Sequence, residues 1–222
     1  MTSLFSIYSC LLSYPEAELL AALTDIEQAL AEQHALTAMQ PVLTLLQGND
    51  LISLQENYVA TFDRNPSHSL HLFEHVHGES RERGQAMVGL VEEYRNAGFD
   101  VVDSELPDYV PLFLEFLALL DREKALALLD DAIHVLAHIG RHLHRNHSPY
   151  HVIFSALEDL ARVAPEDIAF EAPRDMDEAM ILFGTAADGC EPLLNKKPQA
   201  AQAVKFYTRP AGAALCQEKG HD

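Results

Sequence analysis

Residues 109–121 read YVPLFLEFLALLD, and they are the strongest indication of how this chain folds. Apolar side chains occupy almost every position, which leaves little polar surface beyond Glu115. A helix that is apolar on all sides lies in the core of a domain. We therefore expect this segment to form the central helix. Asp108 is its predicted N-cap, and Pro111 is tolerated because first-turn amides have no intrahelical partner.

Upstream of this segment, apolar residues recur at helical spacing. Stripes that step by three or four residues predict amphipathic helices that start near four positions: Leu4, Leu19, Leu36 and Leu51. Pro15 separates the first two stripes, because a proline cannot continue a helix. The helical pattern returns from Met87 to Tyr94 and ends at Gly98, which is expected to adopt the left-handed conformation with Phe99 packed back onto Tyr94.

Downstream of the central segment the same pattern continues. Residues 122–145 have the apolar stripe of one long amphipathic helix. Ser148 followed by Pro149 predicts the N-cap and the first position of another helix. Because no segment alternates as a strand does, the predicted fold class is all-α, a single-domain helical bundle of about eight or nine helices.

Two parts of the chain lack this regularity. Residues 63–79 contain a proline, a glycine and four histidines, and connections of this length are often functional or disordered. Beyond Pro165, prolines and glycines interrupt short apolar patches. We therefore predict a helical domain over residues 1–165 and, over residues 166–222, a short helix at 175–186 within a flexible tail.

Composition excludes several classes of function. The chain carries 34 acidic and 15 basic residues, which gives a formal net charge of −19. This field repels phosphate backbones and anionic lipid, and the sequence shows no local basic patch, so nucleic acid is an unsuitable partner. No long stretch is free of charge, no secretory signal starts the chain, and the three cysteines are far apart. We expect a cytoplasmic protein with no direct membrane insertion.

Histidines are the residues that most suggest a metal site. His134, His138 and His142 lie on one face of a helix, but we interpret that face as solvated, with Asp130 paired to His134. Glu74 and His77 match half of a di-iron motif, which requires a second pair and further carboxylates. Nucleophile-elbow and nucleotide-binding glycine motifs are missing from the sequence. We predict no metal, no cofactor, no catalytic residue and no enzymatic activity.

An acidic stretch lies directly before the central helix. Asp100, Asp103, Glu105 and Asp108 precede the most apolar segment of the chain. One interpretation is a solvated start of a helix. The other is an acidic rim on an apolar groove, which would suit a short amphipathic segment with a basic end.

Residues 58–87 and 105–117 carry a resemblance to a known family. They read YVATFDRNPSHSLHLFEHVHGESRERGQAM, followed after a short gap by ELPDYVPLFLEFL. This sequence resembles the NarJ-type nitrate reductase assembly chaperones of the wider TorD and DmsD family. The resemblance implies an all-helical chaperone that recognises the N-terminal segment of the apo alpha subunit, the catalytic subunit of a respiratory nitrate reductase. It would support insertion of the molybdenum cofactor and hold back premature membrane docking.

The resemblance also implies the site and the partners. The family motif of glutamate, proline, aspartate and histidine falls on Glu105, Pro107, Asp108 and Tyr109, with tyrosine in place of the histidine. Glu105 and Asp108 would face the basic end of the peptide. Its apolar face would contact three residues of the central helix, which are equally suited to the core: Leu112, Phe113 and Leu117. The implied partners are the nitrate reductase alpha subunit and proteins of molybdenum cofactor biosynthesis.

Two other classes of function stay open at this point. A regulatory or structural interaction protein would bind a folded partner surface and would ignore an isolated N-terminal peptide. A histidine-based metalloenzyme would retain a stoichiometric metal after purification.

Overall fold

The computed structural model describes residues 3–77, 81–101 and 105–168. Within these ranges the chain forms ten α-helices, one π-helical turn and one 3₁₀ turn, and it contains no strand. The predicted all-α class is therefore confirmed. The short helix predicted at 175–186 and the tail around it lie outside the described residues. No helix in the described part is both long and apolar enough to cross a membrane.

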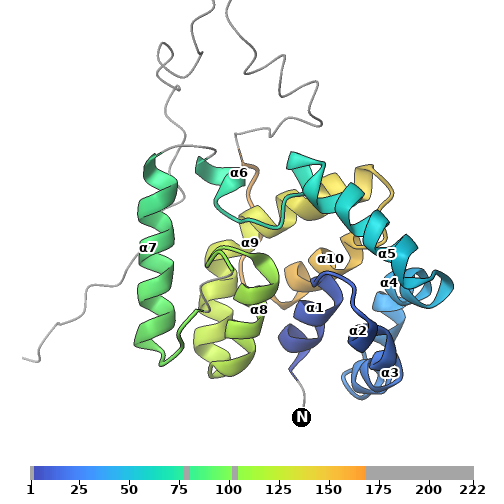
Figure 1. Cartoon of the computed structure of the whole chain (residues 1–222). Helices are drawn as coiled ribbons and strands as arrows, with labels where there is room; N and C mark the ends of the chain where they lie inside the picture. Colours follow the sequence, from blue (N-terminus) through green and yellow to red (C-terminus); the bar gives the residue numbers. More distant parts are fainter. Residues whose placement is uncertain (1–2, 78–80, 102–104, 169–222) are drawn as a thin grey trace, which may run out of the picture.

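Helices α2–α5 form one side of the molecule, and α1 lies beside them toward the middle (Figure 1). Their bounds follow the apolar stripes: α1 Leu4–Leu12, α2 Ala17–Ala21, α3 Leu23–Glu32, α4 Leu36–Gly48 and α5 Leu51–Tyr58. The single helix predicted from Leu19 is two, because the chain bends at Ala22 between α2 and α3. Asp50 caps α5 by accepting a hydrogen bond from the Ser53 amide at 3.0 Å.

The predicted central helix is α8, Val110–Leu119. It is buried along most of its length and packs mainly on α1 and α9. The Ser9 hydroxyl donates to the carbonyl of Pro111 at 2.7 Å, which satisfies a first-turn group across the α1 interface. The prediction of Asp108 as N-cap is wrong. Tyr109 holds the N-cap position without a side-chain bond, because the Asp108 carboxylate is committed elsewhere.

Helices α9, Arg122–Arg145, and α10, His151–Leu160, pack along each other. Their close approach depends on Gly140, where a Cβ atom would lie 2.7 Å from Cβ of Phe154. The predicted N-cap at Ser148 is two residues early, because residues 148–150 form a turn before regular helical bonding begins. The Ser148 carbonyl accepts from the His151 amide at 3.2 Å, and Tyr150 is the N-cap.

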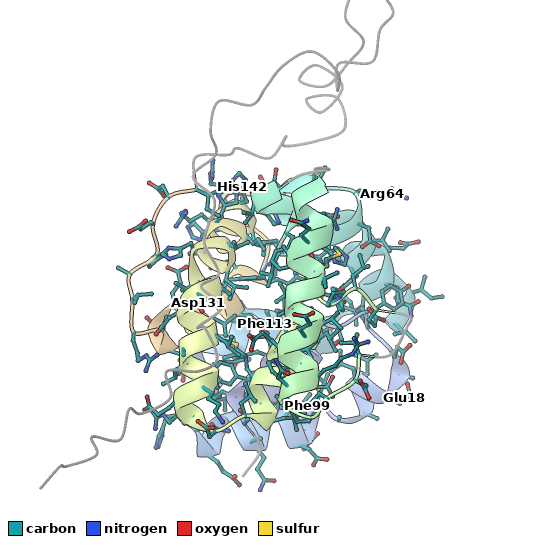
Figure 2. The ribbon with its side chains drawn as sticks, turned by 90° about the vertical axis from the view of Figure 1, so that its left-hand side faces the viewer. Glu18, Arg64, Phe99, Phe113, Asp131 and His142 are labelled. Carbon is teal, nitrogen blue, oxygen red and sulfur yellow. The ribbon has the colours of Figure 1, made fainter. Side chains whose placement is uncertain are left out.

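Helix α7, Arg81–Asn96, lies on the opposite side from α2–α5 (Figure 1). Its C-terminus has the predicted left-handed glycine, Gly98, with φ of 86°. The Phe99 amide bonds the Tyr94 carbonyl and the Gly98 amide bonds the Arg95 carbonyl, both at 2.9 Å, which is a Schellman motif. The Phe99 ring packs edge-on against Phe116, with ring centroids 5.7 Å apart. Figure 2 looks onto this side and shows α7 in front of α8 and beside α9.

Candidate binding site

A pocket of about 350 Å³ opens where the chain leaves α5. There α5 runs into the π-helical turn η1, Val59–Asp63, and then into the 3₁₀ turn η2, Pro66–His68. Single π-helical turns are rare and frequently occur at functional sites. The lining residues come from this segment, from the region just after it and from the start of α8: Tyr58, Phe62, Asp63, Pro66, Ser69, Leu70, His71, Glu74 and Tyr109.

Aromatic residues hold the floor of this pocket in place. The Tyr58 hydroxyl donates to the carbonyl of Leu12 at 2.9 Å, and it lies 2.9 Å from the Tyr109 hydroxyl. The ring of Phe62 packs between Tyr58 and Tyr150, with centroids 4.8 and 5.0 Å away. Such tilted and edge-on pairs stabilise a core beyond the area they bury. The floor is therefore rigid and formed before any ligand arrives.

The wall opposite α5 is attached to the start of α8 by Asp108. This residue is completely buried, and its carboxylate accepts from the Phe73 amide at 3.1 Å and lies 3.4 Å from Nδ1 of His71. Its carbonyl accepts from the Leu72 amide at 3.0 Å. An antiparallel bridge also joins His71 and Tyr109. Asp108 therefore positions the pocket wall instead of facing solvent.

The pocket contains uncharged tyrosine hydroxyls, and its acidic mouth is formed by the exposed Asp63 and the half-buried Glu74. Burial raises the pKa of Tyr109, and the Glu105 and Asp63 charges raise it further, although the Tyr58 hydrogen bond opposes this. Burial also raises the pKa of Tyr58. For His71, burial lowers the pKa, but the hydrogen bond and charge of Asp108 outweigh it and the net shift is upward. The hydroxyls of Tyr58 and Tyr109 thus stay protonated at physiological pH.

Two carboxylates line the pocket, and they are held differently. Asp63 is exposed at the end of η1. Glu74 accepts a hydrogen bond from the Ser69 hydroxyl and forms a 3.1 Å salt bridge with Arg83 of α7. Acidic groups above an aromatic floor favour a cationic side chain, which gains Coulomb attraction from the carboxylates and cation–π attraction from the rings.

The residues predicted as a binding site fall into three environments. Glu105 is exposed. Tyr109 lines the pocket. The two residues before it, Pro107 and Asp108, are buried and hold it in place. The Pro107 carbonyl accepts a hydrogen bond from the Tyr94 hydroxyl at 2.7 Å. The three predicted apolar residues lie deeper along α8. Leu112 is half-buried, and Phe113 and Leu117 are buried.

Sequence reasoning did not assign Asp63, His71 or Glu74 to this site. All three lie in the stretch that carries the family resemblance, within or beside the irregular connection at residues 63–79. That connection is not a plain loop, because it contains η2 and the short helix α6, Glu74–His77. The lack of helical periodicity over residues 63–79 was the feature of the sequence that pointed to a functional site there, since connections of this length are often functional.

The interpretation of the α9 histidines as a solvated face is wrong for two of them. His138 and His142 are buried, with 5% and 6% of their surface exposed. The segment from η2 to α6 covers them: the His75 ring lies 5.7 Å from His138, and His68 Nε2 lies 2.8 Å from Asn146 Nδ2. Figure 2 shows His142 near the end of α9 beside α6. Within the described ranges, no three potential metal ligands lie close enough to hold an ion.

Several known proteins are similar to this chain over most of its length. The family described as nitrate reductase delta subunit matches residues 17–155. The nitrate reductase molybdenum cofactor assembly chaperone NarJ of Escherichia coli (strain K12) is 39% identical over 188 residues, which cover 78% of each chain. The probable chaperone NarW of the same strain is 38% identical over 162 residues, covering 71% of this chain and 68% of NarW. A probable NarJ of Bacillus subtilis (strain 168) is 34% identical over 163 residues, covering 70% of this chain and 89% of that protein.

The chain therefore belongs to the nitrate reductase delta subunit family. Within that family it is similar to the NarJ-type assembly chaperones, which confirms the resemblance carried by residues 58–117. The prediction that the chain is not an enzyme is also confirmed, because these relatives are named as assembly chaperones.

Proposed function

We propose that this protein is a cytoplasmic assembly chaperone that binds the N-terminal segment of an apo nitrate reductase alpha subunit. By holding that segment it would support molybdenum cofactor insertion and hold back membrane docking until the client is complete. The family relationship supports the chaperone role. The observation that carries the peptide-binding part is the preformed pocket with Tyr58 and Tyr109 below the carboxylates of Asp63 and Glu74.

The size of this pocket suggests what it receives. A volume of about 350 Å³ accommodates side chains rather than a whole helix. A basic side chain of the client segment would enter it, between the tyrosine hydroxyls and the acidic mouth. The exposed carboxylate of Glu105 would extend the attraction along the surface, because it acts on the same region as Asp63.

The required affinity is modest. A chaperone must bind an unfolded segment and release it when the client folds, which suits a dissociation constant of micromolar or tighter, about −8 kcal/mol or beyond. Burial of a few apolar side chains, each contributing roughly 1.5–3 kcal/mol, together with one anchored cation, is enough for this affinity after the cost of association. No nucleotide is required for release.

Calorimetric titration with a synthetic peptide that copies the N-terminal segment of the cognate alpha subunit tests the proposal. We expect saturable one-to-one binding that weakens with salt, because the charges at the mouth are exposed and screened. Asp63→Asn should weaken binding about two- to fivefold, the range for an exposed ion pair. Asp159→Asn removes an exposed charge on α10 and serves as the matched control, which should bind as the wild type does.

Two results would contradict this function. Absence of peptide binding at low and high salt, with binding of the folded alpha subunit retained, would favour recognition of a folded surface. Normal maturation of the nitrate reductase in cells that lack this protein would remove the chaperone role altogether.

A further inference from the structure

A second pocket, of about 450 Å³, lies between the C-terminal half of α9 and α10. It is separate from the pocket at η1 and shares no lining residue with it. Two arginines and two histidines contribute to its lining, together with one glycine, one serine and one glutamate: Arg141, Arg145, His144, His151, Gly140, Ser155 and Glu158.

The charge of this pocket is opposite to that of the protein as a whole. The chain has a formal net charge of −19 and only 15 lysines and arginines, yet two arginines line this one depression. The basic residues of this pocket come mainly from α9, and α10 adds one histidine. Arg141, His144 and Arg145 lie on adjacent turns of α9, and His151 is the first residue of α10.

Close contact between the two helices shapes the depression. Gly140 lies directly against Phe154, so the backbones approach each other and the side chains of the following α9 turn flank the contact. The rings of His144 and His151 meet edge to face, with centroids 4.7 Å apart. Nδ1 of His151 lies 2.8 Å from the Ser148 carbonyl and donates to it, so Nε2 is the ring nitrogen left to meet a ligand.

Both arginines keep their positive charge available to a ligand. Arg141 has an exposed carboxylate partner that a stronger anion could displace, and Arg145 has a neutral partner. Arg141 pairs at 3.2 Å with Asp167, whose side chain is 95% exposed, and an ion pair this exposed contributes little stability. Nη2 of Arg145 lies 3.1 Å from Nε2 of His142. Because a guanidinium only donates, His142 accepts there as a neutral ring, and the full positive charge of Arg145 is retained at the pocket.

Glu158 is the carboxylate that lines this pocket. Burial raises its pKa, the charge of Arg141 lowers it, and Asp159 raises it, with a net upward shift. Its charge nevertheless opposes an anion, which makes it a useful site for a test: removal of the charge should strengthen the binding of an anion and weaken the binding of a cation.

We propose that the pocket between α9 and α10 binds the phosphoryl group of a small phosphate-bearing molecule. A phosphoryl group offers several acceptor oxygens in the geometry that guanidinium forks match, and Arg141 and Arg145 present two such forks one helical turn apart. The carboxylate of Asp167 on Arg141 marks where one anionic oxygen would lie. The strongly negative surroundings make nucleic acid unsuitable, so a small molecule is the ligand that fits.

Titration of the full-length protein with inorganic pyrophosphate, followed by calorimetry at low ionic strength, tests this inference. We expect saturable one-to-one binding that Arg141→Gln and Arg145→Gln each weaken by about tenfold or more, since a hydrogen bond to a charged group is lost in each case. Glu158→Gln and Asp167→Asn should tighten it. Arg95→Gln removes an exposed charge on α7 and is the matched control, which should leave pyrophosphate affinity unchanged.

Nuclear magnetic resonance of the histidine side chains gives a readout that does not depend on the arginine variants. The ring signals of His144 and His151 should move with pyrophosphate, whereas those of the exposed His34 should stay fixed. Parallel titrations with inorganic phosphate and a nucleoside diphosphate show whether the phosphoryl group alone or an attached nucleoside determines affinity.

Three results would overturn the inference. One is the absence of saturable pyrophosphate binding at low ionic strength. The second is binding that the two arginine substitutions leave unchanged, which would place the ligand elsewhere. The third is selective binding of an acidic peptide that copies residues 171–178 of this chain, with no binding of any phosphate compound. The alpha-subunit peptide should bind to Arg145→Gln as it does to the wild type, so failure at this pocket is distinguishable from failure at η1.

Discussion

Acidification from pH 8 to pH 5 should destabilise this protein through the histidines buried between α9 and the segment from η2 to α6. Burial is the largest cause that lowers the pKa of each of these four histidines, and neighbouring rings lower it further in the last three: His68, His75, His138 and His142. Arg141 and Arg145 lower the pKa of His138 and His142 further. The pKa falls to about 3 for His138 and to about 4 for His142.

The direction and size of the effect follow from these values. A histidine that stays neutral in the folded state but takes up a proton in the unfolded state favours unfolding below its ordinary pKa of about 6.5. At pH 5, about 1.5 units lower, each such histidine costs roughly 2 kcal/mol at 1.36 kcal/mol per unit. His138 and His142 together cost about 4 kcal/mol, a large part of a typical stability of 5–15 kcal/mol. The raised pKa of His71 acts in the opposite direction and offsets part of this loss.

Urea unfolding followed by circular dichroism at pH 8, 7, 6 and 5 measures the effect. The midpoint should fall steadily below pH 6.5 while the slope stays constant. In His138→Leu the loss between pH 8 and pH 5 should shrink by about 2 kcal/mol. His144→Leu, which changes an exposed histidine of the same helix, should keep the full pH dependence. Equal midpoints at pH 8 and pH 5, or an unchanged dependence in His138→Leu, would refute the reasoning.

Three further substitutions test the packing and the site by thermal or urea unfolding. Gly140→Ala forces α9 away from Phe154 and should lower the free energy of unfolding by about 1–3 kcal/mol. Val88→Ala, at an exposed position, should change the free energy of unfolding little. Equal stability of the two variants would contradict the close contact at Gly140. Gly98→Ala places a side chain at φ of 86° and should cost about 1–2 kcal/mol. Tyr58→Phe leaves the Leu12 carbonyl without its donor, should cost about 1–2 kcal/mol and should weaken peptide binding at η1.

Local sequence patterns predicted much of the fold. The apolar stripes located most helices, because burial of one face is a property of the helix itself and has a fixed period. The glycine at residue 98 was predicted for a similar reason, since its Schellman motif involves only neighbouring residues. The segment at residues 110–119 is apolar except for Glu115, and it is buried along most of its length because it has almost no polar face to expose.

Contacts between distant segments could not be predicted in this way. Asp108 looked like a helix cap, but its carboxylate binds the amide of Phe73, 35 residues earlier. His138 and His142 looked solvated because one helix alone does not show that residues 66–77 cover them. The second pocket could not be predicted for the same reason, because His151 and Glu158 meet Arg141 only after α10 folds back along α9.

The bond from the Val110 amide to the Leu70 carbonyl, at 2.8 Å, also bears on the order of events during synthesis. It closes a loop of about 40 residues, and loop closure of this kind must precede the contacts that stabilise it. When only the first hundred residues have left the ribosome, Tyr58 of α5 therefore lacks its neighbour Tyr109. A growing chain at that stage lacks the complete pocket at η1, so the peptide binding that we propose requires copies of this protein whose synthesis has passed α8.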